Sequence, residues 1–119
     1  MPPTTYTMVA FIKRKEGMSV ADFNHHWEAV HGPLVKPWAE KYGMTYKQIF
    51  IGSDTPLGDT SSAALAPYDG CAVFEMADAD VIRRAWKDEY FQRDVTPDQA
   101  LFMQESQTIM TTGGTVTIA

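Results

Sequence analysis

The chain has 119 residues, 45% hydrophobic and 21% charged, with a formal net charge of −5, which is typical of one ordinary globular domain. The acidic balance argues against a nucleic-acid surface, which needs clustered Lys and Arg. One cysteine, Cys71, excludes an internal disulfide. No apolar run approaches the roughly 18 residues that span a bilayer. We therefore expect a single domain over residues 1–119, located in the cytoplasm.

A strand and a helix are predicted first. Residues 6–15 alternate small and large apolar side chains and end in K-R-K, which is typical of a strand. Ser19 with Asp22 three positions later indicates a helix start, with Ser19 as the N-cap. At about 100° per residue, one apolar stripe of this helix carries Phe23, Trp27, Val30 and Leu34.

Gly32-Pro33 is predicted to end this helix, because proline has no N–H and crowds the preceding turn. A helical segment can resume over residues 34–42. His31 would then lie at a helix C-terminus, where a protonated imidazole is favoured. His26 and His31 would lie on opposite shoulders of the apolar stripe, roughly 140° apart.

The rest of the chain is predicted to contain further helices and strands. A second helix follows Asp78 or Asp80, and Thr96 followed by Pro97 predicts the N-terminus of a short further helix. The Gly/Ser/Pro-rich residues 52–67 form a loop that is either a lid or slack chain. The other predicted strands are residues 45–51, 68–76 and 105–112, the last being broken by Gly113-Gly114.

The resulting order is strand, helix, strand, strand, helix, strand. This α+β order predicts a ferredoxin-like β-α-β-β-α-β fold, with an antiparallel sheet and the helices on one face. The other face would be uncovered in a single chain. Because both faces of the first and third strands carry apolar side chains, we expect a homodimer in which two sheets pack together.

Three stretches resemble a known family: V-A-F-I-K-R-K-E-G-M-S-V-A-D-F-N-H-H-W-E-A-V-H-G-P-L, Y-D-G-C-A-V-F-E and D-E-Y-F-Q-R-D-V-T-P-D-Q-A-L-F. They are similar to the EthD-domain family of dimeric α+β barrels, over roughly residues 6–112. Within that family the chain most resembles small fungal decarboxylases and dehydratases of aromatic polyketide pathways, which act on anthraquinone or anthrone carboxylic acids. The F-x-x-x-W-x-x-x-H-x-P-L run specifies the fold more than the reaction.

The resemblance implies a cofactor-independent lyase, and a decarboxylase is the leading hypothesis. His31 is then the candidate proton donor, and His26 holds the substrate carboxylate or tunes His31. Gln99 stands where the family usually has Glu, so Asp98 is the carboxylate carried over, to orient a histidine. Tyr46 and Tyr90 are candidates to bind a ring oxygen. The plainer alternatives are structural histidines and an acid that stabilises a first helical turn.

Aromatic side chains supply flat apolar area that could sandwich a polycyclic substrate, although large aromatics also dominate ordinary cores. The candidate substrate-binding residues are Trp27, Trp38, Phe50, Trp86 and Phe91. No cofactor and no metal are expected, since the histidine spacing forms no i, i+4 pair and H-E-x-x-H is absent. The alternatives that stay open are a polyketide dehydratase or cyclase, a non-catalytic aromatic-binding module, and a haem-dependent oxygenase with His31 as axial ligand.

Overall fold

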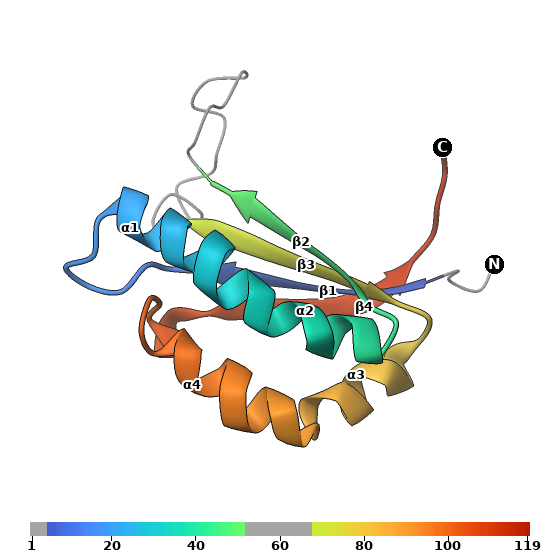
Figure 1. Cartoon of the computed structure of the whole chain (residues 1–119). Coiled ribbons are helices and arrows are strands. Elements are labelled where there is room, and N and C mark those ends of the chain that lie inside the picture. Colours follow the sequence, from blue (N-terminus) through green and yellow to red (C-terminus); the bar gives the residue numbers. More distant parts are fainter. Residues whose placement is uncertain (1–4, 52–67) are drawn as a thin grey trace.

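The computed structural model describes residues 5–51 and 68–119, so the loop expected at 52–67 lies outside the described residues. The sheet is antiparallel with the strand order β2-β3-β1-β4 (Figure 1). Its strands are β1 (Thr5–Ile12), β2 (Thr45–Phe50), β3 (Gly70–Met76) and β4 (Ile109–Thr115). This order confirms the predicted ferredoxin-like fold.

Two helical arms lie side by side over one face of the sheet (Figure 1). Each arm contains a π-helical segment, which joins α1 to α2 directly in the first arm and is separated from α3 by a turn at residues 87–88 in the second. The first arm is α1 (Val20–His25), the π segment His26–His31 and α2 (Gly32–Lys41); the second is α3 (Ala79–Trp86), the π segment Phe91–Val95 and α4 (Thr96–Gln99). Within the described part of the chain, no helix has the length and apolar character needed to cross a membrane.

The first helix does not end at Gly32-Pro33, so that prediction is wrong. The Gly32 N–H donates to the carbonyl of Trp27, five residues back. This wider π turn lets the helix continue past Pro33, which has no N–H of its own. The second arm repeats the arrangement, because the Thr96 N–H donates to the carbonyl of Phe91. Thr96 is therefore inside a helix and is not its N-cap.

The π turn also moves the apolar stripe of the first arm. Phe23 and Trp27 are buried as predicted, but the next inward position passes from Val30 to His31. Val30 is 41% exposed, whereas His31 is only 5% exposed. In a π turn each N–H bonds to the carbonyl five residues earlier, where an α-helix bonds to the fourth. His26 and His31, which are five residues apart, therefore lie on one side of the helix. The predicted opposite shoulders, and the helix C-terminus at His31, are both wrong.

The last strand was predicted over residues 105–112 and is found at Ile109–Thr115, so it begins later and ends later than predicted. β4 runs through Gly113 and Gly114 because both pair with β1, opposite Thr7 and Tyr6. Glu105–Gln107 forms a 3-10 turn and not the start of the strand. Main-chain pairing along the whole edge therefore outweighs the low strand preference of two glycines.

The sheet face opposite the helices carries half-buried and exposed apolar side chains. Cys71 and Val73 lie on this open face of β3, as their alternation predicts, and Val9 lies beside Val73 on β1. Ile49 and Ile109, toward the two edges, are each 51% exposed. Cys71 is buried, whereas Val9 and Val73 stay half-buried and the two isoleucines exposed in the described chain.

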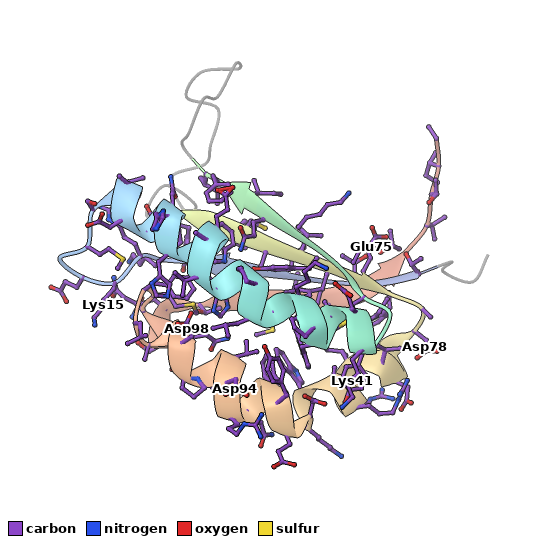
Figure 2. All side chains as sticks on the ribbon, viewed as in Figure 1. Lys15, Lys41, Glu75, Asp78, Asp94 and Asp98 are labelled. Carbon is purple, nitrogen blue, oxygen red and sulfur yellow. The ribbon has the colours of Figure 1, made fainter. Side chains whose placement is uncertain are left out.

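Asp88 holds the two helical arms together at their far end. Its carboxylate accepts hydrogen bonds from Lys41 Nζ at 2.6 Å, from the Tyr42 hydroxyl at 2.9 Å and from the Phe91 N–H at 3.0 Å. The labelled Lys41 lies at the end of α2 nearest α3 (Figure 2). The Lys41 hydrogen bond is the main cause that lowers the pKa of Asp88 to about 2. The ionised carboxylate is thus part of the folded structure.

We expect Asp88→Asn to lower the free energy of unfolding by about 1–2 kcal/mol at pH 7, since it weakens a charged, nearly buried hydrogen-bond acceptor. The folded pKa lies below the ordinary value of 3.8, so the wild-type contribution is complete above about pH 4 and is lost as the pH falls toward 2. Urea unfolding of both proteins at several pH values measures this. Asp94→Asn, at a more exposed ion pair with Arg93, is the matched control; an equal loss there would contradict the prediction.

Candidate functional site

Two histidines of the first arm meet one carboxylate of the second. His31 Nδ1 lies 2.9 Å from Asp98 Oδ2, and His26 Nε2 lies 3.0 Å from the same oxygen and 3.1 Å from Oδ1. Asp98 and His31 are buried, whereas His26 is partly exposed. Figure 2 shows the labelled Asp98 between α4 and the first arm. The three side chains form a row that runs from the surface into the interior.

Phe102 holds this row in place from the direction of the core. Its ring stacks on the His26 imidazole at 4.9 Å between centroids and packs against His31 at 4.8 Å. Phe102 itself is fully buried. Both imidazoles therefore have one face against a fixed aromatic ring and one nitrogen on Asp98, which leaves little freedom of rotation.

The hydrogen bond to Asp98 determines which nitrogen of His31 is free. A carboxylate only accepts hydrogen bonds, so Nδ1 carries the hydrogen and Nε2 keeps its lone pair. Burial lowers the pKa of His31 below its ordinary 6.5, more than the hydrogen bond and charge of Asp98 raise it, and the nearby His26 lowers it further. His31 is thus a neutral base at pH 7, and not the protonated imidazole expected at a helix end.

A cavity of about 330 Å³ lies between the sheet and the two arms, with His31 in its wall. This volume is at the lower end of the range for small-molecule sites, about 300–1,000 Å³. Its polar lining residues are His31, Tyr46, Thr96, Gln99, Glu105 and Thr108. Its apolar lining residues are Met8, Ala10, Ile12, Trp27, Val35, Trp38, Ala72, Phe74, Trp86, Phe91, Val95, Phe102, Met103 and Met110.

Tyr46 presents a phenol to the same cavity. Gln48 Nε2 donates to the Tyr46 hydroxyl oxygen at 2.9 Å and to the Trp27 carbonyl at 2.8 Å. Burial raises the pKa of Tyr46 to about 12, so the phenol keeps its hydrogen at neutral pH. Because its oxygen already accepts from Gln48, that hydrogen is available for a ligand oxygen.

Sequence reasoning missed Gln48, which contacts Tyr46, and four polar residues of the lining, Thr96, Gln99, Glu105 and Thr108. For Gln48 a signal existed: it follows Tyr46 by two positions, so both side chains lie on one face of the predicted strand. Thr108 had no such signal, because the segment before β4 was predicted to be part of the strand. Its place in the lining follows from the 3-10 turn.

The other predicted site residues divide into two groups. Trp27, Trp38, Trp86 and Phe91 line the cavity, as a substrate-binding role requires. Trp38 is also a core residue, since its indole N–H donates to the Ala85 carbonyl at 2.8 Å and its ring stacks on Phe91 at 4.3 Å. Trp27, Trp38 and Phe91 are thus core residues that also line the cavity, which is compatible with either interpretation.

Four predicted residues lie outside the lining: Asp98, which contacts both histidines, and Tyr90, Phe50 and His26. Tyr90 donates its hydroxyl to the Leu34 carbonyl at 2.6 Å and so links the two arms. Phe50 packs edge-on against Trp27, away from the cavity. His26 contacts Asp98 and is not part of the wall, so of its two predicted roles the tuning of His31 fits the geometry. In the ranges 5–51 and 68–119, no group of three or more His, Cys, Asp or Glu is arranged to hold a metal ion.

The fold and the cavity define a ferredoxin-like α+β protein with an internal, largely apolar cavity that has a histidine in its wall. Residues 15–106 match the EthD domain family, and the chain belongs to that family. A solved EthD family protein from Bacillus halodurans superposes with a TM-score of 0.68 at 15% identity, over 94% of this chain and 99% of that one. At this identity the likeness bears on the fold alone.

Two curated relatives carry names of enzymes. The chain is 29% identical to "Dehydratase ustZ" of Ustilaginoidea virens over 84% of its own length and 76% of the relative's. It is 26% identical to "Decarboxylase AgnL1" of Paecilomyces divaricatus over 84% of its own length and 71% of the relative's. The sequence is thus similar to enzymes of two related reaction types.

Proposed function

We propose that this protein is a lyase that eliminates water from a flat, oxygenated aromatic substrate of polyketide type, with His31 as general base and Tyr46 as hydrogen-bond donor. The observation that carries the proposal is the neutral His31 imidazole in the wall of a largely apolar cavity, with Nδ1 held by Asp98. A base of this kind suits proton abstraction next to a carbonyl group.

The reaction needs only these groups and the substrate. His31 Nε2 removes a proton from the carbon next to a ketone, and the electron pair moves onto the ketone oxygen as an enolate. The Tyr46 hydroxyl donates a hydrogen bond to that oxygen as negative charge develops on it. The enolate then expels the hydroxyl group of the adjacent carbon, which takes the proton from the His31 imidazolium and leaves as water. Asp98 stabilises the transient imidazolium.

Decarboxylation, the reaction that the sequence favours, becomes the second candidate. No Lys or Arg of the described chain lines the cavity, and Glu105 does. A substrate carboxylate would therefore enter a largely apolar space without a positive partner, which is costly. The same exclusion of water would favour loss of the carboxylate group once the substrate is bound. The similarity to a protein named as a decarboxylase supports decarboxylation as the second candidate.

Mass spectrometry of the products distinguishes the reactions. Purified protein is incubated with a β-hydroxy ketone fused to an aromatic ring system and, separately, with an anthraquinone carboxylic acid. Loss of water from the first supports the proposal, and loss of carbon dioxide from the second supports the alternative. Binding of both compounds without turnover would favour a non-catalytic binding module, and a haem absorbance band with oxygen-dependent products would favour the oxygenase. Binding without turnover, or haem-dependent oxidation, would overturn the lyase proposal.

We further propose that the protein is a homodimer joined through the open face of the sheet. Val9 and Val73 at its centre are only half-buried, and Ile49 at its edge is 51% exposed, which is an apolar surface that a second copy would cover. Analytical ultracentrifugation is expected to show a dimer that Val73→Lys converts to a folded monomer. A wild-type monomer at micromolar concentration would contradict this.

A further inference from the structure

The Thr108 hydroxyl is a buried polar group without a partner. Its Oγ1 atom is inaccessible to solvent and makes no hydrogen bond within the described part of the chain. The Thr108 main chain is satisfied at its N–H, which donates to the Glu105 carbonyl at 3.2 Å. A buried hydroxyl left without a hydrogen bond is destabilising, so such groups call for an explanation.

The position of Thr108 in the fold supplies an explanation for its unpaired hydroxyl. Thr108 lies directly before β4, and it lines the same cavity as His31 and Tyr46. By alternation along the strand it shares the helix-facing side with Met110, another lining residue. Thr108 borders the proposed substrate cavity, and rotation about its Cα–Cβ bond can turn the covered, unpaired hydroxyl toward a ligand there.

We propose that Thr108 binds an oxygen atom of the substrate, at the end of the cavity away from Tyr46. Tyr46 is on β2 and Thr108 adjoins β4, the two edge strands of the sheet. Three strand spacings separate the two strands, about 14 Å, and Tyr46 is level with Thr112, four residues or about 13 Å along β4 from Thr108, so the two main chains are about 19 Å apart. A ligand that reaches both groups is an extended fused ring system with oxygen substituents toward both ends. A single ring would reach only one.

This inference rests on the proposed function for the location of the substrate, but its test measures binding and needs no turnover. The probes are a dihydroxyanthraquinone, which carries the ring oxygens, and anthracene, which has none. Trp27, Trp38 and Trp86 line the cavity, so quenching of tryptophan fluorescence reports binding of either probe. The variants are Thr108→Val, which keeps the shape without the hydroxyl, and Thr108→Ser, which keeps the hydroxyl.

Thr108→Val is expected to change stability and binding in opposite directions. Without ligand its Tm rises by about 2–5 °C, because an unpaired buried hydroxyl is removed. Its affinity for the dihydroxyanthraquinone falls by about 3- to 10-fold, the loss of one hydrogen bond, while its affinity for anthracene is unchanged. Thr108→Ser retains the affinity for the dihydroxyanthraquinone.

Two results would overturn the inference. A lower Tm for Thr108→Val would mean that the hydroxyl stabilises the unliganded protein through a partner of its own. Equal affinity of wild type and Thr108→Val for the dihydroxyanthraquinone would mean that the hydroxyl does not contact the ligand. Neither result depends on whether the protein eliminates water, so failure of this inference and failure of the proposed function are separable.

Discussion

His31→Gln should lower kcat by about 10²- to 10⁴-fold, because it removes the proposed general base while it keeps a polar side chain of similar size. The measurement is single-turnover kinetics on whichever substrate the mass assay identifies. His25→Gln is the matched control, since His25 is on the same helical arm but is exposed and lies outside the cavity lining. Equal turnover by His31→Gln and wild type would remove His31 from the mechanism.

The pH profile tests the same assignment independently. The pKa of His31 lies below 6.5 because burial disfavours its charged form, and only the neutral form can accept a proton. The wild-type rate should therefore stay constant from neutral pH down to about 6.5 and fall as the pH drops through the lowered pKa. The residual rate of His31→Gln should lack this acidic limb. A wild-type rate that rises on acidification would indicate a protonated His31 as the acid, as the decarboxylase hypothesis supposed.

Asp98→Asn should also cost about 10²- to 10⁴-fold in kcat, although Asp98 itself is not part of the cavity lining. An amide can donate a hydrogen bond to His31 Nδ1, which would move the imidazole hydrogen to Nε2 and abolish its lone pair there. The variant also removes the negative charge that stabilises the imidazolium. We therefore expect Asp98 to act as a positioning residue for His31.

Imidazole nitrogen NMR separates this role from a merely structural one. The wild-type His31 should give the signals of an Nδ1–H tautomer, and Asp98→Asn those of an Nε2–H tautomer. Because Asp98 raises the pKa of His31, any acidic limb that remains should move to lower pH. Asp94→Asn, on the same helical arm, should change neither property. An unchanged tautomer with lost activity would show that Asp98 serves the fold alone.

The sequence predicted the elements whose signals are local. Alternation along β3 placed Cys71 and Val73 on one face, and the register with β1 agrees. Ser19 caps the first helix as expected, since its Oγ accepts from the Asp22 N–H at 3.0 Å. Such signals depend on neighbours a few residues away. The order of elements and the ferredoxin-like class followed from them.

Helix continuity was mispredicted for a physical reason. Gly32-Pro33 and Thr96-Pro97 both read as interruptions, because a proline interrupts an α-helical hydrogen-bond pattern. In the folded chain a π turn before each proline carries the helix through, and each π segment packs two buried side chains into the interior. A local rule cannot weigh that packing, so His31 was expected at a helix end and is instead buried within a helix.

The sequence by itself determined the order and face of the strands, the start of the first helix and the residue types available for acid–base chemistry, since these depend on periodicity and capping between near neighbours. Tertiary structure alone decided that His26 and His31 share Asp98, 72 and 67 positions away. The physical reason is that a contact between separate elements depends on how two helices pack on one sheet, and the local pattern around either residue carries no information about its distant partner.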